Sequence, residues 1–263
     1  MINPITNMKD AFALNGQNVI VTGGNRGLGF AIADAMAQSG ANIAILCRDI
    51  TKAEETIEKL NVYGGKYECF SCDVTDMQNV KKAVADVYDS FGEVNCLVNN
   101  AGVTTSGSFL DMDEELSEWY RVLNTDLNGV AIMTYVVGNR MRDAGKGGSI
   151  INVTSLSGLV VHKAGPRSPY NAAKAGANHF THSMAVELGK YDIRVNAIAP
   201  GFFRAGFGEN PGPELIKAAN EQQVLNRLGE GIEVGAMAVF LASPAAGHIT
   251  GTVQVIDGGL ILS

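Results

Sequence analysis

Cysteine, basic charge and long apolar runs are all scarce in this chain of 263 residues. Its four cysteines are too few for a disulfide framework, so reduced thiols are expected. No stretch approaches the roughly 18 uninterrupted apolar residues of a membrane helix, and Met1–Asn15 has no apolar core of signal-peptide length. We therefore expect a cytoplasmic protein with no membrane association.

Basic residues are outnumbered, with 20 Lys and Arg against 27 Asp and Glu and a formal net charge of −7. Nucleic-acid binders normally carry the opposite excess, so no nucleic acid is expected as a partner. Hydrophobic residues make up 46% of the chain and charged residues 18%. This composition excludes extended disorder and allows a sizeable buried core.

Two short spacings look like metal-ligand patterns but lack further ligands. Cys69 and Cys72 form a CxxC motif in a predicted strand, where residues three apart point to opposite faces. No second Cys or His pair lies nearby to complete a zinc site. His179 and His182 stand about one helical turn apart, without a carboxylate or third ligand at a suitable spacing. We therefore expect neither a metal site nor a redox role for the CxxC motif.

Short β-branched runs alternate with longer segments of helical period from Asn18 to the C-terminus. The predicted strands are Asn18–Thr22, Asn42–Cys47, Lys66–Cys72, Cys96–Asn99, Ser149–Thr154, Arg194–Ile198 and Thr252–Ile256. The predicted helices are Gly27–Ser39, Thr51–Leu60, Met77–Phe91, Leu116–Arg142, Tyr170–Gly189 and Ile232–Ala242. This alternation is typical of a parallel sheet covered by helices on both faces. The sequence predicts an α/β fold in which residues 1–263 form a single doubly wound domain.

Residues 201–226 break the alternation, because they are first rich in Gly and Pro and then helical. An insertion beyond the carboxyl end of a strand lies where α/β sheets bind ligands, so we expect a substrate lid there. Phe202, Phe203 and Phe207 either form an apolar lid or pack under its helix. Arg204 either approaches cofactor phosphates or faces water.

A glycine-rich turn joins the first predicted strand to the first predicted helix. Glycine lets the backbone turn tightly and approach a pyrophosphate, while the helix N-terminus offers N–H groups and partial positive charge. This strand–turn–helix context indicates a dinucleotide site. The residues expected to contact the cofactor here are Gly23, Asn25, Arg26, Gly27, Leu28 and Gly29.

The end of the second predicted strand favours NADP(H) over NAD(H). NAD-binding units place an acidic residue about 20 positions after the glycine turn, to bind the ribose 2′-OH. This chain has Cys47-Arg48 there, and both Arg48 and Arg26 can reach a 2′-phosphate with charge-assisted hydrogen bonds. Alternatively, Arg48 pairs with Asp49 or Glu55 and faces solvent. Cys47 is expected to be a thiol beside the adenosine pocket.

Further motifs follow in order along almost the whole chain. They are Asp73-Val74, Asn99-Asn100-Ala101-Gly102, Ser155, Tyr170-Asn171-Ala172-Ala173-Lys174, Ile193-Arg194-Val195-Asn196, Pro200-Gly201 and Asp257-Gly258-Gly259. Together with the glycine turn, they closely resemble those of the classical short-chain dehydrogenase/reductase family. The resemblance implies a seven-stranded Rossmann domain and nicotinamide hydride transfer. It further implies cofactor contacts from Asp73, which binds the adenine amino group, and from Val74, Asn99, Ala101, Gly102, Tyr170, Lys174, Pro200, Gly201 and Phe203.

Tyr170 and Lys174 are four residues apart, which places them on one face of a predicted helix. Reduction of a carbonyl needs a proton donor at the oxygen while hydride arrives at the carbon. A nearby ammonium favours the deprotonated form of a tyrosine, so this pair can exchange a proton with a substrate. The family resemblance implies that Lys174 also holds the nicotinamide ribose and that Ser155 orients the substrate carbonyl.

The chain departs from the family pattern at Asp126, where relatives usually have an asparagine that holds a water in a proton relay. Asn124 and Asn128 lie two positions to either side, about 200° around a helix, so neither takes over that face. An ionised Asp126 would strengthen the charged form of Lys174, whereas a protonated one would imitate an amide by donating one bond. We expect catalysis to survive the change.

A second departure is Phe202-Phe203-Arg204-Ala205, where the family often has a threonine that contacts the cofactor.

The segment from Ser155 to Tyr170 is about two residues longer than in many family members. This resembles the branch of NADP-dependent mannitol dehydrogenases, sorbose reductases and carbonyl reductases, so a ketose or small ketone is the expected substrate. His162, Lys163 and Arg167 either bind sugar hydroxyls or serve solubility.

Three alternatives to a ketose reductase remain open. They are a 3-oxoacyl carrier-protein reductase, a dehydrogenase of apolar secondary alcohols and a non-catalytic NADP-binding sensor. A carrier protein would need a basic landing patch, which the mixed charges of the lid do not provide.

The resemblance also implies a homotetramer. Its dimer surfaces would come from the two long helices Leu116–Arg142 and Tyr170–Gly189, with Leu260-Ile261-Leu262 closing a second surface. On this basis His179 and His182 lie at an interface or in the core.

Overall fold

The computed structural model describes residues 7–8, 10–105, 107–161, 167–205 and 212–262. Seven parallel strands form one sheet in the order β3-β2-β1-β4-β5-β6-β7. The strands are β1 Asn18–Thr22, β2 Asn42–Cys47, β3 Tyr67–Ser71, β4 Cys96–Asn99, β5 Gly148–Val153, β6 Ile193–Pro200 and β7 Val253–Ile256. The strand order reverses direction between β1 and β4, which is the position where doubly wound sheets bind ligands.

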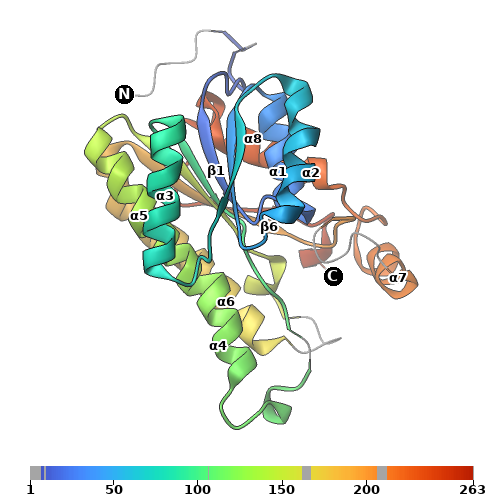
Figure 1. Ribbon diagram of the computed structural model, residues 1–263. Coiled ribbons are helices and arrows are strands. Elements are labelled where there is room, and N and C mark those ends of the chain that lie inside the picture. The colour runs from blue at the N-terminus through green and yellow to red at the C-terminus, as the bar shows by residue number, and fades with distance from the viewer. Residues whose placement is uncertain (1–6, 9, 106, 162–166, 206–211, 263) are drawn as a thin grey trace.

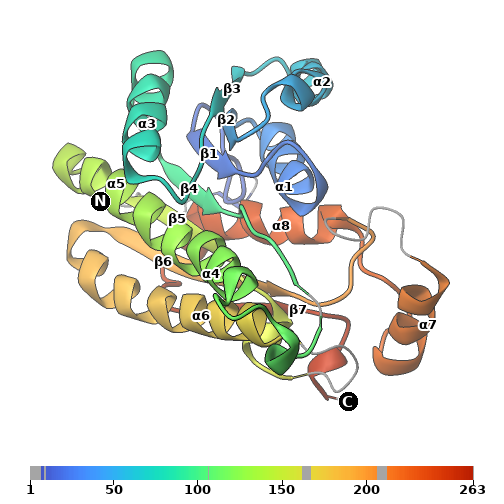
Figure 2. The same cartoon turned by 60° about the horizontal axis from the view of Figure 1, so that its bottom comes forward.

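Helices cover both faces of this sheet (Figures 1 and 2). The helices are α1 Gly27–Gln38, α2 Thr51–Leu60, α3 Met77–Phe91, α4 Ser117–Leu123, α5 Gly129–Ala144, α6 Ser168–Leu188, α7 Pro213–Gln222 and α8 Gly231–Ala242. One buried cluster joins α1, α2 and α8 to the sheet, and a second joins α3, α5 and α6 to the opposite face. The predicted α/β doubly wound fold with seven parallel strands is confirmed.

The strands are apolar on both sides because each face packs against helices. All eight residues of β6 are buried, and four of the five in β1 are buried. Near-continuous hydrophobic runs are the pattern expected of parallel strands covered on both faces. Within the described residues, no helix is long and apolar enough to cross a membrane.

The long helix predicted over Leu116–Arg142 is interrupted, and this part of the prediction is wrong. The structure has α4, then a π-helical turn over Asn124–Asn128, and then α5. A π-turn inserts one residue into the helical register and so changes which side chain faces inward. Asp126 is fully buried, whereas Asn124 and Asn128 bind each other at the surface, with Asn128 Nδ2 2.9 Å from Asn124 Oδ1.

Helices α1 and α8 approach each other through small residues. A Cβ atom at Gly235 would lie 2.6 Å from Ala35 Cβ and 2.7 Å from the Ala31 carbonyl oxygen. Glycine is therefore required at this crossing for steric reasons. In contrast, a Cβ atom at Gly138 of α5 would meet its nearest neighbour, Leu188, at 3.8 Å, an ordinary contact.

Alanine substitutions at these two helical glycines should change stability in opposite directions. Gly235→Ala forces α1 and α8 apart and should lower the free energy of unfolding by about 1–3 kcal/mol. Gly138→Ala fits the available space and should raise it by about 0.5–1 kcal/mol, because alanine restricts the unfolded chain. Urea denaturation of both variants measures the difference. Equal effects at the two positions would contradict the close approach at Gly235.

Candidate active site

The glycine turn between β1 and α1 has the backbone geometry that requires glycine. Gly23 and Gly27 have positive φ angles of 64° and 57°. A side chain at Gly29 would collide with the Gly23 carbonyl oxygen and with Asn100 Nδ2. Asn100 Nδ2 holds the turn in place by donating to the Thr22 carbonyl oxygen at 3.0 Å and to that of Gly23 at 3.2 Å.

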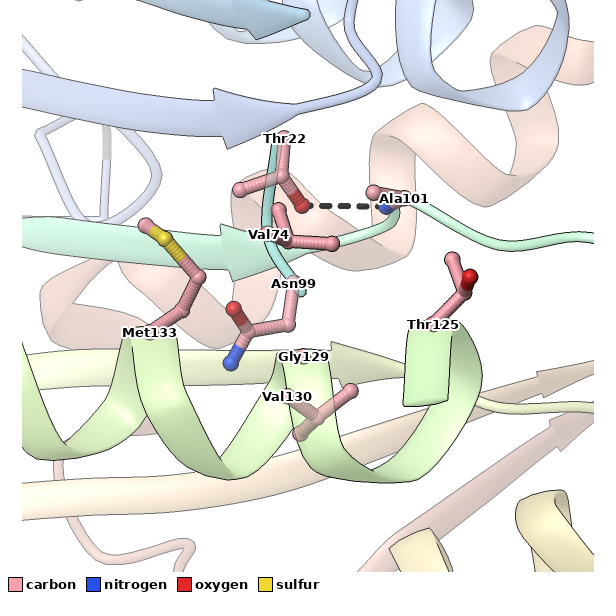
Figure 3. A pocket seen from close by; sticks show the side chains of 8 residues that line it. All are labelled: Thr22, Val74, Asn99, Ala101, Thr125, Gly129, Val130 and Met133. Carbon is pink, nitrogen blue, oxygen red and sulfur yellow. Dashed lines mark hydrogen bonds between the residues drawn. The ribbon is translucent and has the colours of Figure 1, made fainter. Parts of the chain in front are cut away.

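Thr22 fastens this turn to the end of the neighbouring strand β4. Its Oγ1 accepts from the backbone N–H groups of Asn100 at 2.9 Å and Ala101 at 3.0 Å (Figure 3). On the other side, Thr56 Oγ1 of α2 donates to the Asn25 carbonyl oxygen at 3.0 Å. The turn is thus connected to both the central strands and α2.

The N-terminus of α1 is suited to an anion. Its N-cap residue, Arg26, is extended, exposed and provides no capping side chain. Helix α3 is instead capped by the Asp76 side chain, and α8 has a capping box between Glu230 and Glu233. The absence of a side-chain cap, together with the glycine cradle, fits the pyrophosphate of a dinucleotide.

The residues expected at the adenosine end lie at the carboxyl ends of β2 and β3. Arg48 is exposed, and the described part of the chain shows no ion pair between it and Asp49 or Glu55. The pKa of Asp73 is lowered, first because the Thr75 backbone N–H donates to it and further because Arg48 is near. Arg48 follows the end of β2 and Asp73 follows β3, so both lie at the edge of the sheet where the glycine turn lies.

Tyr170 and Lys174 occupy the first turns of α6, and Ser155 follows the end of β5. All three are mostly buried, with exposed fractions of 8%, 3% and 8%. Lys174 Nζ donates to the Val153 carbonyl oxygen at 3.1 Å and lies 5.6 Å from the centre of the Tyr170 ring. Ser155 Oγ accepts from the Ser157 N–H at 3.1 Å, which leaves its own proton available for another acceptor.

Asp126 forms a buried ion pair with Lys174. Its Oδ2 lies 3.0 Å from Lys174 Nζ, and its Oδ1 accepts from the Val103 N–H at 2.8 Å. A Cβ atom at Gly102 would lie 2.9 Å from Asp126 Oδ2, so Gly102 leaves the room that the carboxylate fills. Burial alone would lower the pKa of Lys174, but Asp126 and then Tyr170 outweigh burial and leave this pKa raised.

A network of buried amides and hydroxyls lies behind this group. Asn99 Nδ2 donates to Thr134 Oγ1 at 3.1 Å and to Asn152 Oδ1 at 2.9 Å, and Asn152 Nδ2 donates to Thr181 Oγ1 at 2.9 Å. The network joins β4, β5, α5 and α6. Asn99 was predicted from its motif, but Asn152, Thr134 and Thr181 were not. Their signal in the sequence is a polar side chain within an otherwise apolar buried segment, such as Asn152 in Ile150–Val153.

A small hollow separates the end of β4 from the π-turn and α5. It is lined from the strand side by Thr22, Val74, Asn99 and Ala101, and from the helix side by Thr125, Gly129, Val130 and Met133 (Figure 3). Three residues predicted to contact the cofactor, Val74, Asn99 and Ala101, therefore lie together. Asn99 Oδ1 is buried without a hydrogen-bond partner and faces this region.

The first residues of the segment expected to form a lid are packed rather than open. Phe203 is buried with the α1–α8 core cluster, and its backbone pairs with that of Gly229. A Cβ atom at Gly229 would collide with the Phe203 ring. Phe203 is thus packed rather than part of an open lid, but in a cluster that contains no residue of the lid helix α7, and Phe207 lies outside the described residues. Pro200 is the last residue of β6, and Gly201 directly after it packs against Asp257, because a Cβ atom at Gly201 would lie 2.7 Å from Asp257 Cβ.

Three other sets of candidate residues were named from the sequence. Arg204 is exposed to water, as one of its two alternatives describes, and pairs with Glu230 at 3.2 Å on the surface. Arg167 is exposed at the start of α6, and His162 and Lys163 lie outside the described residues. His179 and His182 are exposed on α6 with ring centres 5.7 Å apart, so a core location within the chain is wrong.

The chain is similar to known proteins over almost its whole length. A family model described as Enoyl-(Acyl carrier protein) reductase matches residues 22–261. Sorbose reductase SOU1 of Candida albicans is 36% identical over 258 residues, covering 97% of this chain and 90% of that protein. The 3-oxoacyl-(acyl-carrier-protein) reductase of Synechocystis sp. is 34% identical over 252 residues, covering 95% and 99%.

The structural comparison agrees. The crystal structure of NADPH-dependent 3-quinuclidinone reductase from Rhodotorula rubra has a TM-score of 0.92 at 31% identity, covering 100% of this chain and 98% of that one. The fold and these relatives define an oxidoreductase of CH–OH or C=O groups that uses a nicotinamide cofactor. The chain belongs to the classical short-chain dehydrogenase/reductase family, as its motifs predict.

Replacing Asp126 with asparagine should move the alkaline limit of activity to lower pH. The carboxylate raises the pKa of Lys174 against the effect of burial, so its removal lets the ammonium lose its proton earlier. We expect a shift of about one pH unit or more in the alkaline limb of kcat/KM, with activity retained near neutral pH. The measurement is a pH profile of the wild type and Asp126→Asn. An unchanged profile would show that the carboxylate does not tune the lysine.

The free energies of unfolding of two variants at position 126 test the same ion pair independently of activity. Asp126→Ala leaves a buried ammonium unpaired and should cost about 3–5 kcal/mol, whereas Asp126→Asn keeps an acceptor for the Val103 N–H and should cost less. Because the folded-state pKa of Lys174 is raised, the contribution of the pair to folding is complete below its ordinary pKa of 10.5. It is lost as pH rises through the folded-state value. Denaturant titrations at neutral and alkaline pH measure both effects.

Proposed function

We propose that this protein reduces the carbonyl of a ketose or small ketone with NADPH. The observation that carries the proposal is the buried group of Tyr170, Lys174 and Asp126 beside Ser155, at the same edge of the sheet as the glycine turn. Relatives named for sorbose and 3-quinuclidinone reduction support a ketone substrate. The expected location is the cytoplasm.

The side chains divide the chemistry among them. The nicotinamide, when bound, supplies hydride to the carbonyl carbon. The Tyr170 hydroxyl donates a proton to the carbonyl oxygen, and the Ser155 hydroxyl donates a hydrogen bond that orients this oxygen. Lys174 stays protonated beside Tyr170 and holds the nicotinamide ribose.

Asp126 acts in this proposal by balancing charge. The ammonium of Lys174 is 3% exposed and would be costly to bury alone. Asp126 offsets that cost at 3.0 Å and fixes the position of Nζ, together with the Val153 carbonyl. This arrangement favours the ionised role for Asp126 over the protonated one, in which it imitates an amide.

The cofactor contacts follow from the elements around the glycine turn. In this proposal Gly23, Asn25, Gly27, Leu28 and Gly29 approach the pyrophosphate through their backbone. Arg26 and Arg48 bind the 2′-phosphate, because both are exposed on the same side of the sheet edge. The remaining contacts come from Asp73, Val74, Asn99, Ala101, Gly102, Pro200, Gly201 and Phe203.

The charges of the lid argue against a carrier protein as substrate. The basic side chains that flank or belong to the lid and are described pair with carboxylates of this chain: Arg204 with Glu230, Lys217 with Glu221, and Arg227 with Glu233. A docking surface for an acidic carrier needs unpaired basic charge. For this reason we rank a 3-oxoacyl carrier-protein reductase second. The Synechocystis relative is the observation that supports this second candidate. Residues 201–226 form the proposed lid.

Substituting Arg48 tests the choice of cofactor. Arg48→Ala removes a charged donor to the 2′-phosphate, which is worth about 1.5–3 kcal/mol, so KM for NADPH should rise at least about tenfold. KM for NADH should not change, because NADH has no 2′-phosphate. Arg142→Ala is the matched control, since Arg142 is an exposed arginine paired with Asp143 at the end of α5. Equal effects on both cofactors would argue against Arg48 as the 2′-phosphate contact.

The substrate class is tested by following NADPH and NADH oxidation with a panel of carbonyl compounds. The panel contains fructose, sorbose, xylulose, 5-ketogluconate, a diketone and an acetoacetyl thioester. We expect turnover of a ketose with NADPH, reduced by about 10² or more in Tyr170→Phe, which lacks the proton donor. Turnover of the thioester or of apolar ketones alone would favour a competing assignment. Cofactor binding without any turnover would favour the sensor.

We also propose a homotetramer. Tyr135 of α5 and Val186 of α6 are 61% and 83% exposed, and the histidine pair of α6 lies on the same exposed surface. Leu262 near the C-terminus is 80% exposed and would help to close a second interface. Light scattering coupled to size exclusion should give four times the mass of one chain. A monomeric mass would refute this proposal.

A further inference from the structure

Two cysteines from neighbouring strands lie side by side near the adenosine end of the candidate site. Cys47 is the last residue of β2, and Cys69 lies in β3 opposite Ile45. Their sulfur atoms are 3.5 Å apart, and both side chains belong to the core cluster under α1 and α2. Both are free thiols.

The CxxC motif does not form this pair. Cys72 packs in the core cluster on the opposite face of the sheet, as expected for a residue three positions from Cys69 near a strand end. Burial raises the pKa of Cys72 to about 12, and that of Cys96 likewise to about 12. Such thiols are poor nucleophiles, because only the thiolate reacts readily.

The surroundings of Cys47 and Cys69 favour reaction between them. The pKa of Cys47 is lowered, first by its hydrogen bond with Cys69, since a Cys69 thiol at 3.5 Å can donate to the Cys47 thiolate. The same contact raises the pKa of Cys69. Cys47 is therefore the nucleophile of the pair, and Cys69 is the thiol that can react with it once Cys47 has been oxidised.

The pair is connected to the proposed cofactor contacts. Arg48 follows Cys47 directly, and Cys47 Sγ donates to the Asp49 carbonyl oxygen at 3.3 Å across the turn that contains Arg48. A disulfide sulfur has no proton, so this hydrogen bond is lost when the sulfur is oxidised.

We propose that Cys47 and Cys69 are a reversible modification site, which a peroxide converts to a disulfide that weakens NADPH binding. The Cys47 thiolate attacks one peroxide oxygen, forms a sulfenic acid and releases the other oxygen as water after protonation. Cys69 then attacks the Cys47 sulfur, and the sulfenic oxygen leaves as a second water. Two thiols lose two electrons and two protons, and the peroxide O–O bond accepts the electrons.

The sheet can accommodate this bond at its edge. A disulfide requires an S–S distance of about 2.05 Å, so the sulfurs must approach from their present 3.5 Å. Strand β3 is the outermost strand on this side of the sheet and pairs only with β2, so it can shift without breaking a second ladder. The Cys47 side chain moves toward Cys69 and away from the Asp49 carbonyl.

The bond itself is tested by intact mass and peptide mapping after treatment with hydrogen peroxide. Wild type and Cys72→Ala should each lose about 2 Da, with Cys47 and Cys69 in one linked peptide pair, and dithiothreitol should restore the original mass. Cys47→Ser and Cys69→Ser should show no such link. Cys72→Ala is the matched control, because Cys72 belongs to the same CxxC motif. A Cys69–Cys72 link, or stable sulfenic or sulfinic acid without a disulfide, would overturn the proposal.

The effect on the cofactor rests on the function proposed above and has its own readout. Fluorescence titration of NADPH should give a Kd about three- to tenfold higher for oxidised than for reduced wild type, as expected for the loss of one supporting hydrogen bond. Cys69→Ser should show no such difference. An unchanged Kd in protein with the mapped disulfide would overturn the effect on the cofactor. Failure of the reduced protein to bind NADPH would contradict the proposed function, whereas the mass measurement would still decide the disulfide.

Discussion

The buried ion pair between Asp126 and Lys174 is the constraint on which the candidate site depends. An ammonium removed from water is costly unless a counter-charge and hydrogen-bond partners lie within contact distance. Three separate parts of the chain meet that requirement here. The π-turn aims Asp126 inward, Gly102 leaves the space for its carboxylate, and the end of β5 offers the Val153 carbonyl to Nζ. Tyr170 then stands next to a lysine whose charge and position are both fixed, which is the condition for controlled proton transfer.

The rest of the fold brings these parts to one edge of the sheet. Parallel strands end on the same side, so the glycine turn after β1, the segment after β4 and Ser155 after β5 converge. Hydrogen bonds from Asn100 and to Thr22 then connect the cofactor side to the central strands. Behind the catalytic group, the amides of Asn99 and Asn152 connect the sheet to α5 and α6. Hydrogen bonds of this kind are directional, so they restrict the positions of the site's side chains more tightly than apolar packing does.

The sequence predicted the fold and the family correctly for reasons that are local, and the structure brings many of the predicted site residues to one edge of the sheet. Short apolar runs and segments of helical period predict the strands and helices, and a spacing of four residues places Tyr170 and Lys174 on one face. What escaped prediction depends on contacts between distant segments. The π-turn that buries Asp126 has no periodic signature, and the burial of Phe203 depends on Gly229, which is 26 positions away. Likewise, the CxxC motif directs attention to Cys72, whereas the sulfur beside Cys69 belongs to Cys47 on another strand.

The packing of Phe203 on Gly229 has a consequence for how this scaffold can diversify. The two residues pair at the point where the lid leaves the sheet and returns, and the Arg204 N–H and Gly229 carbonyl add a 2.8 Å hydrogen bond there. The segment between them, which contains α7, therefore starts and ends at a fixed contact. Doubling the length of a loop costs only about 0.6 kcal/mol of closure entropy. Evolution can therefore lengthen, shorten or replace this segment while Tyr170, Lys174 and Asp126 remain in place.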